Sequence, residues 1–249
     1  MAKTLYKKSY QLNSFKLIRF DDLWGKKGIF STIRILGSEP KLILLNSHIK
    51  NMNLGLTKMN IKFVITEKII LELLKPALSN ITSKDNLLRV GITSSKISVS
   101  LRRRIKPDKK FFGVLHAYQR PIPDLKNLYY KKIIKLLNSI NLQKQEIILH
   151  YKGLLFEGCT TNIFCVRNKK IYIPKNNYYK GVTMSYLLKH SQREIKKSNI
   201  SLNNLHKYEE IILTGSGKGV LNLSSIPQID WKSKSDLVYK EFLNLYKKI

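Results

Sequence analysis

Glu157 is an acidic residue in a segment that is otherwise apolar. Residues 154–156 (LLF) precede it, and residues 163–166 (IFCV) follow after a short polar interval. A carboxylate buried among such residues is costly unless a cationic group meets it. The residues in between, 158–162, are small and polar, as in a tight turn. The pattern therefore predicts a buried acid that faces a cationic partner.

Two later segments could hold an anion through backbone N–H groups. Residues 180–185 (KGVTMS) open a predicted helix, whose first free N–H groups lie near Val182 and Thr183. Residues 214–220 (TGSGKGV) end a predicted strand in small residues, whose N–H groups can also face an anion. The second segment is not a Walker phosphate loop, because the upstream glycine and the Ser or Thr after the lysine are missing. A plain tight turn explains it equally well.

The charge of the chain favours anionic ligands. Lys and Arg number 46 against 16 Asp and Glu, which gives a formal net charge of +30. The lysines are spread along the whole chain, and the densest basic run, residues 101–110, has no interleaved aromatic residues. Sites for single-stranded nucleic acid use such aromatic residues for stacking. We therefore expect anionic small molecules as ligands, and no nucleic-acid partner.

The two cysteines, Cys159 and Cys165, predict neither a metal site nor a disulfide. A zinc site needs more ligands, and we expect both thiols to be small buried groups. No apolar run reaches the roughly 18 residues of a membrane helix. Residues 1–15 lack the apolar centre of a signal peptide. We expect a cytosolic protein that holds no metal and crosses no membrane.

The hydrophobic pattern predicts an α+β chain in two domains. Strands are expected at 27–36, 41–45, 87–92, 96–101, 146–150, 154–158, 162–166, 170–174 and 209–216, and helices at 46–61, 66–78, 125–140, 181–198 and 236–248. Asn46 or Ser47 is the expected cap of the first helix. Prolines in the middle of the chain favour a linker. The prediction is a small domain over 1–115, a linker over 116–122 and a larger domain of strands and helices over 123–249.

Four blocks of the sequence resemble, in the right order, the class IV aminotransferase family. They are residues 25–49 (GKKGIFSTIRILGSEPKLILLNSHI), 157–166 (EGCTTNIFCV), 180–188 (KGVTMSYLL) and 208–226 (YEEIILTGSGKGVLNLSSI). The family includes branched-chain and D-amino acid aminotransferases and aminodeoxychorismate lyase. The resemblance implies a two-domain enzyme of pyridoxal phosphate (PLP) fold type IV, similar to D-amino acid aminotransferase. It also implies a homodimer with PLP between the domains.

The resemblance implies roles for individual residues. Lys126, in DLKNLYY and 31 residues before Glu157, resembles the lysine to which PLP attaches, at the start of a helix. Such a lysine can also move protons at the substrate α-carbon. Glu157 would bond the pyridine nitrogen and keep it protonated, which makes the ring an electron sink. The other implied ligands are Tyr130 for the phenolic oxygen of PLP, and Val182, Thr183, Ser216 and Gly217 for its phosphate.

One position departs from the family pattern. An arginine usually stands three residues after the histidine of the LxxH block and binds the phosphate, but here His48 is followed by Asn51 at that place. Asparagine cannot supply the charge and the two directed bonds of arginine. Lys50 is the candidate to replace it. A protein of this fold that has lost PLP and serves as a basic binding protein is one alternative.

The short chain and the LLNSHI segment resemble aminodeoxychorismate lyase more than the other members. That reaction releases pyruvate and gives 4-aminobenzoate for folate synthesis, and Thr32 would assist Lys126 near the substrate. The alternative is a transaminase for branched-chain or D-amino acids. Both reactions share their first steps, so Lys126 and Glu157 do not discriminate between them.

Overall fold

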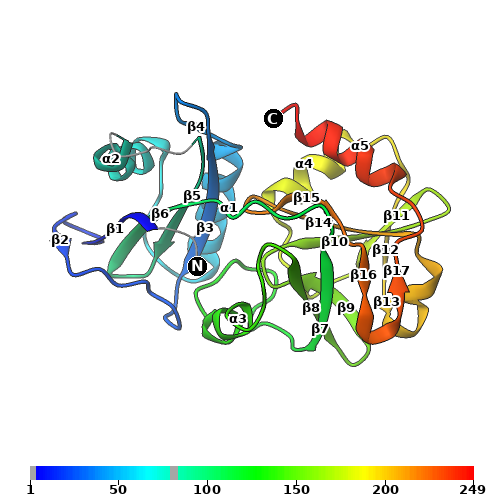
Figure 1. Ribbon diagram of the computed structural model, residues 1–249. Coiled ribbons are helices and arrows are strands. Elements are labelled where there is room, and N and C mark those ends of the chain that lie inside the picture. The colour runs from blue at the N-terminus through cyan, green and yellow to red at the C-terminus, as the bar shows by residue number, and fades with distance from the viewer. Residues whose placement is uncertain (1–3, 79–83) are drawn as a thin grey trace. The chain divides into compact units, whose positions relative to one another are not determined.

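The computed structural model describes residues 4–78 and 84–249, which fall into two units (Figure 1). The first unit comprises Met1–Arg104 and Leu125–Lys131, and the second comprises Ile105–Asp124 and Lys132–Ile249. This division differs from the expected boundary. Residues 112–117 form strand β7, which pairs with a strand of the second unit, and residues 125–131 pair with a strand of the first. Neither pairing is visible in local sequence, because each partner lies far along the chain.

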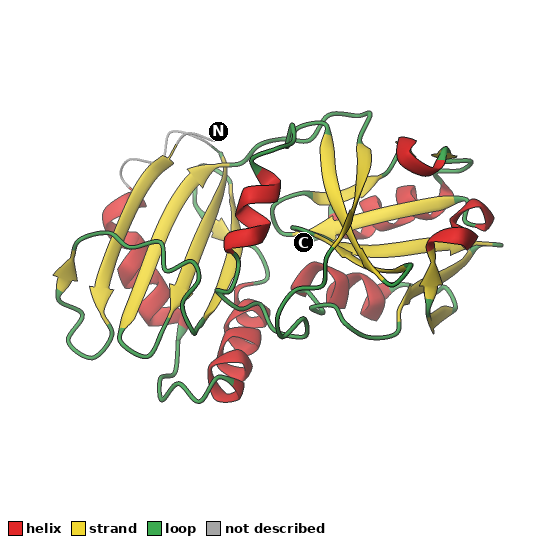
Figure 2. Cartoon of the chain, turned by 90° about the horizontal axis from the view of Figure 1, so that it is seen from below, coloured by secondary structure: helices red, strands yellow, loops and turns green. Residues whose placement is uncertain are grey.

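The first unit is built on an antiparallel six-stranded sheet in the order β2-β1-β6-β5-β3-β4. Its strands are β1 (Thr4–Gln11), β2 (Leu17–Ile18), β3 (Ile29–Leu36), β4 (Lys41–Leu42), β5 (Asp85–Ile92) and β6 (Lys96–Arg103). Helices α1 (Leu45–Lys58) and α2 (Glu67–Leu78) pack on one face of this sheet (Figure 2). The expected strands at 27–36, 87–92 and 96–101 are confirmed. Strand β1 was not predicted, because its sequence (TLYKKSYQ) lacks apolar alternation.

The start of α1 differs from the expectation. The helix begins at Leu45, and Leu44 precedes it in the left-handed conformation with φ of 54°. No side chain caps the helix, so neither Asn46 nor Ser47 has the predicted role. The tight turn after β4 determines where the helix begins.

Residues 125–130 are extended along the edge of β3 and are not the start of a helix. The Phe30 N–H donates to the Lys126 carbonyl at 2.9 Å, and the Leu128 N–H donates to the Gly28 carbonyl at 2.9 Å. These backbone groups are therefore used by β3 and are unavailable to a helix. Helix α3 (Lys131–Leu137) begins five residues after Lys126. The expected helix over 125–140 is thus shorter and begins later.

The second unit contains two sheets. One has the order β13-β9-β8-β7-β16-β17 and the other the order β12-β11-β10-β14-β15. The strands are β7 (Phe112–Ala117), β8 (Gln145–Tyr151), β9 (Leu154–Gly158), β10 (Asn162–Arg167), β11 (Lys170–Pro174), β12 (Ile195–Ser198), β13 (Ile200–Ser201), β14 (Glu210–Gly215), β15 (Gly219–Asn222), β16 (Ser225–Ile226) and β17 (Trp231–Lys232). Both expected hairpins, β8–β9 and β10–β11, are confirmed.

Helices α4 (Val182–His190) and α5 (Leu237–Tyr246) pack against the five-stranded sheet. The expected helix over 181–198 was too long. It ends at His190, and residues 195–198 form β12, which pairs in parallel with β11. The predicted helical pattern continued into β12 because that strand (IKKS) is short and mostly exposed.

Candidate active site

Glu157 lies near the end of β9, and its carboxylate is buried against Arg120. The Arg120 Nε donates to the Glu157 Oε1 at 2.6 Å, and only 4% and 6% of the two side chains are exposed. The Tyr179 N–H donates to the Glu157 Oε2 at 3.2 Å. A second guanidinium nitrogen of Arg120 donates to the Pro123 carbonyl at 2.8 Å. The cationic partner that the sequence demanded within this unit is therefore Arg120, which stabilises the ionised carboxylate.

Sequence reasoning missed Arg120. It lies in the segment QRPIP, which was interpreted as a linker because of its prolines. The available signal was a single arginine ahead of two prolines, in a chain whose cations are mostly lysines. Planar, bidentate pairing with a carboxylate favours arginine over lysine at such a buried site.

Asn162, the last polar residue of the 157–166 block, holds the segment that leads into α4. Its Oδ1 accepts from the Gly181 N–H at 3.0 Å, and its Nδ2 donates to the Tyr179 carbonyl. A Cβ on Gly181 would lie 2.5 Å from that Oδ1, so this position has room for glycine alone. Glu157 and Asn162 thus both fix residues 179–181. Their contacts place the start of α4, with Val182 and Thr183 buried at its first turn.

The turn between β14 and β15 lies against the turn that follows Glu157. Thr214 pairs with Asn162 across β14 and β10, and a Cβ on Gly215 would lie 2.9 Å from the Thr160 carbonyl oxygen. Ser216 and Gly217 lie half-buried in this turn. The two segments that the sequence singled out as possible anion sites are therefore both connected to β10, at its Asn162 end.

Lys126 belongs to the first unit, where it lies beside an aromatic cluster. Its Nζ is 4.9 Å from the ring centroid of Phe30. The Phe30 ring meets Tyr130 edge-on at 5.0 Å, and Trp24 stacks on Tyr130 at 5.5 Å. Thr32 is half-buried two residues after Phe30 and so projects from the same face of β3. The structure thus brings Lys126 and Tyr130 together around Phe30, with Thr32 on the same strand.

His48 lies close enough to Lys126 to feel its charge. Burial lowers the pKa of His48 from 6.5 to about 3, and the Lys126 charge lowers it further in the same direction. The His48 Nδ1 and the Ser31 Oγ are 2.7 Å apart. Lys50, in contrast, is exposed. It lies two residues after His48 on α1, and therefore on another side of the helix.

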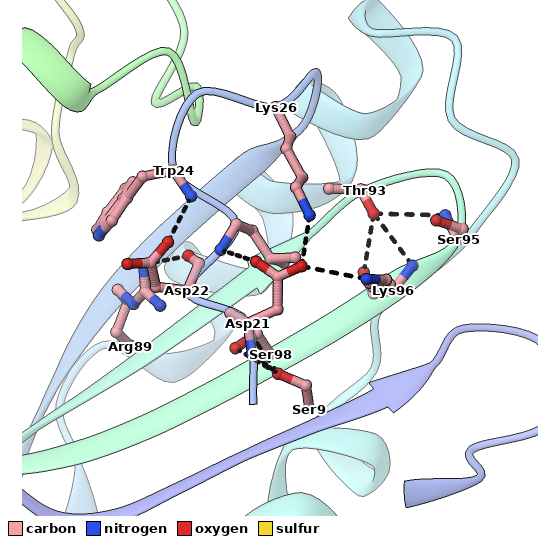
Figure 3. Close-up of polar contacts among 11 residues, drawn as sticks. Ser9, Asp21, Asp22, Trp24, Lys26, Arg89, Thr93, Ser95, Lys96 and Ser98 are labelled. Carbon is pink, nitrogen blue, oxygen red and sulfur yellow. Dashed lines mark hydrogen bonds and ion pairs between the residues drawn. The ribbon is translucent and has the colours of Figure 1, made fainter. Parts of the chain in front are cut away.

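A polar network holds the loop that carries Trp24 (Figure 3). Asp21 accepts hydrogen bonds from Lys26, from Lys96 at 3.1 Å and from the Leu23 N–H at 2.9 Å. The guanidinium of Arg89 donates to the Asp22 carbonyl at 2.9 Å, and its carbon lies 4.2 Å from the Trp24 ring centroid. These contacts fix the loop before β3 and therefore the aromatic cluster beside Lys126.

Residues 28–226 match the family described as amino-transferase class IV. The chain belongs to this family. The match covers most of the sequence and confirms the resemblance of the four blocks.

Curated relatives of this class IV aminotransferase family member carry two kinds of name. It is 24% identical to the aminodeoxychorismate lyase of Bacillus subtilis, over 89% of the chain and 85% of the lyase. It is 26% identical to a probable branched-chain-amino-acid aminotransferase of Rickettsia felis, over 59% of the chain. That match spans only 53% of the Rickettsia protein, so the chain corresponds to about half its length.

Solved structures confirm the fold. An aminotransferase from Brucella abortus bound to PLP matches with a TM-score of 0.77 at 16% identity, over 99% of both chains. The branched-chain aminotransferase of Thermoproteus uzoniensis matches with a TM-score of 0.78 at 14% identity, over 99% of this chain and 94% of that one. The expected α+β fold of the type IV PLP aminotransferases is therefore correct.

The residues present fit PLP, the cofactor of class IV aminotransferases. A buried carboxylate paired with arginine suits a pyridinium nitrogen. The hydroxyls of Thr161 and Thr214 are buried and have no hydrogen-bond partner among the described residues. Both belong to segments that flank the two turns, where further acceptors or donors would satisfy them.

Other classes of site are not found in the described part of the chain. Residues 4–78 and 84–249 contain no group of three or more metal-ligating side chains. Cys159 and Cys165 are buried free thiols, and burial raises the pKa of each. Within the same residues, no helix is both long and apolar enough to cross a membrane.

Proposed function

We propose that this protein binds PLP through Lys126 and Glu157 and releases pyruvate from aminodeoxychorismate to give 4-aminobenzoate. The observation that carries the proposal is the buried Arg120–Glu157 pair, with the Tyr179 N–H on the second carboxylate oxygen. Such a pair is expensive to bury, and its retention suits a carboxylate that must stay ionised beside a cofactor. The Bacillus subtilis lyase supports the choice of reaction, because that match extends over 89% of the chain.

In this proposal each residue has a defined task. Lys126 attaches the cofactor, removes the proton from the substrate α-carbon and later returns a proton. Glu157 holds the proton of the pyridine nitrogen, and Arg120 keeps that carboxylate ionised. When bound, PLP supplies the electron sink for the carbanion at the α-carbon.

The remaining predicted ligands bind or orient. The first N–H groups of α4, at Val182 and Thr183, and the turn with Ser216 and Gly217 bind the phosphate. Tyr130 faces the phenolic oxygen, and Thr32 assists near the substrate. Lys50 remains the candidate for the cation that Asn51 does not supply.

Cofactor binding is tested by titrating the purified protein with PLP and recording visible absorbance. The wild type should develop a band that borohydride reduction traps on Lys126. K126A should lose the band, and E157Q should weaken binding. K132A is the matched control, because Lys132 is an exposed lysine over the ring of Tyr118. A colourless wild type would contradict the proposal and favour the non-catalytic basic binding protein.

The reaction is tested with aminodeoxychorismate and no keto acid. Release of equal amounts of pyruvate and 4-aminobenzoate supports the lyase, since the elimination needs no amino-group acceptor. A transaminase is the second candidate, favoured by the Rickettsia relatives. It would instead convert branched-chain or D-amino acids only when a keto acid is added. A homodimer and a cytosolic location belong to the same proposal, and sedimentation of the purified protein tests the former.

A further inference from the structure

Glu146 is a buried acid outside the predicted site. It is the second residue of β8, and none of its surface is exposed. No role follows for it from the resemblance or from the proposed chemistry. A carboxyl group in such a position is costly, so the groups around it indicate what it holds in place.

Its carboxylate fixes the turn that follows Glu157. The Thr160 N–H donates to the Glu146 Oε1 at 3.3 Å, and the Thr160 hydroxyl donates to the Oε2. A Cβ on Gly158 would lie 2.9 Å from the Glu146 Cγ, so the glycine beside Glu157 packs directly on this side chain. The turn links β9 of one sheet to β10 of the other, and Glu146 anchors it at the crossing.

The same carboxyl group faces a lysine of the second turn. Lys218 lies between Gly217 and β15, is 8% exposed, and its charge acts on Glu146. Its ammonium is directed into the protein, where it donates to the Leu142 carbonyl and lies 4.8 Å from the Phe111 ring centroid. Lys218 is thus one of the few lysines in the described chain that are buried, and Glu146 is the acid whose charge balances it.

The two turns also touch each other. Gly215 approaches the Thr160 carbonyl so closely that a Cβ there would lie 2.9 Å away. Burial raises the pKa of the Glu146 carboxyl, while the Lys218 charge and the Thr160 bonds oppose that shift. Each turn therefore depends on the same buried group, one through hydrogen bonds and the other through charge.

We propose that Glu146 is a positioning residue of the PLP site, which holds the turn 158–161 beside Glu157 and the turn 215–219 in one fixed arrangement. The inference rests on the proposed function, because the two turns are the segments assigned there to the pyridine and phosphate ends of PLP. Its physical basis is that removing either member of a buried polar network leaves the other uncompensated.

The first test uses amide hydrogen exchange of the protein without added PLP, so it does not depend on cofactor binding. E146Q should speed exchange in both turns, 158–161 and 215–219. E210Q is the matched control, since Glu210 is equally buried in this unit but accepts from Ser235 and from the Val238 and Tyr239 N–H groups at the start of α5. E210Q should speed exchange at α5 and leave both turns unchanged.

A second variant tests the coupling from the other turn and serves if E146Q fails to fold. K218M lies in the turn 215–219, yet it should also speed exchange at Thr160. If K218M alters its own turn alone, or if E146Q leaves both turns as in the wild type, the inference is wrong. These results stand whether or not the wild type binds PLP, so the proposed function and this inference can fail separately.

The third measurement is the PLP dissociation constant. We expect E146Q to raise it about tenfold, the lower end of the effect seen when an outer partner of a ligand-binding residue is removed. E210Q should bind PLP as the wild type does. The double variant E146Q/K218M should bind PLP more tightly than the product of the two single effects, since the two groups act as a pair. Equal dissociation constants for wild type and E146Q would overturn the inference.

Discussion

Arg120 and Glu157 form a buried ion pair, with 2.6 Å between the Arg120 Nε and the Glu157 Oε1. The two residues are 37 positions apart, and the pair closes the second unit between the segment after β7 and strand β9. A carboxylate held in this way has one oxygen on a guanidinium and the other on a backbone N–H. It is fixed in orientation before any ligand arrives, which lowers the cost of binding one.

Arg120→Met should lower the free energy of unfolding by about 3–5 kcal/mol, because it leaves a buried carboxylate without its cation. PLP binding should weaken with it. The control is Arg193→Met, whose partner Glu241 is 44% exposed, and there the loss should be below about 1 kcal/mol. Urea denaturation of both variants measures the difference. Equal losses would mean that Glu157 is neutral or hydrated in the native state.

Asn162→Ala should cost about 1–3 kcal/mol, because the Gly181 N–H and the Tyr179 carbonyl lose their partner. It should also weaken PLP binding by loosening the start of α4. Asn222→Ala is the matched control, since its amide holds Ser233 and Ser235 in the same unit. It should cost similar stability without a change in PLP affinity. Denaturation and PLP titration of the two variants give both quantities.

Asp21→Asn should remove a stabilising contribution that depends on acid. Burial acts to raise the pKa of Asp21, but bonds from Lys26, the Leu23 N–H and Lys96 outweigh it and lower the pKa from 3.8 to about 2. The contribution is therefore complete above about pH 4 and is lost as the pH falls towards 2. D21N should be less stable than the wild type at neutral pH and equally stable near pH 2. Asp230→Asn, at a 92% exposed carboxylate, should show no such convergence in thermal unfolding.

His48 should give the opposite member of this pair, at higher pH. Its pKa is about 3 in the folded protein against 6.5 ordinarily, so the unfolded chain binds more protons between these values. Stability should fall as the pH drops from about 6.5 to 3, and His48→Asn should lose that dependence. Unfolding curves at several pH values test this without PLP.

Lys126→Met should raise the pKa of His48, because it removes the positive charge that disfavours the imidazolium. NMR titration of the His48 ring gives the value directly. Lys58→Met is the control, since Lys58 lies ten residues further along α1, roughly 15 Å away. An unchanged His48 pKa in Lys126→Met would mean that the ammonium points away from the imidazole.

The sequence by itself determined the family, the cofactor class and the local elements. The 157–166 block, with its Glu157, Gly158 and Asn162, is specific because each residue type does something that no other can do there. Glycine alone fits beside the Thr161 hydroxyl, and a Cβ at position 158 would lie 2.2 Å from it. The alternation of β3, β5 and β6 and the turns of the hairpins were likewise local signals.

Tertiary structure alone decided which residues meet. Arg120 pairs with Glu157, residues 125–130 pair with β3, and Glu146 reaches Thr160 across two sheets, all over separations that periodicity cannot report. The same distance explains the errors: β7 was taken for a linker, and α3 was placed too early. Hydrogen bonds to distant strands outweighed local propensity in both cases, because a buried backbone must find partners wherever the fold supplies them.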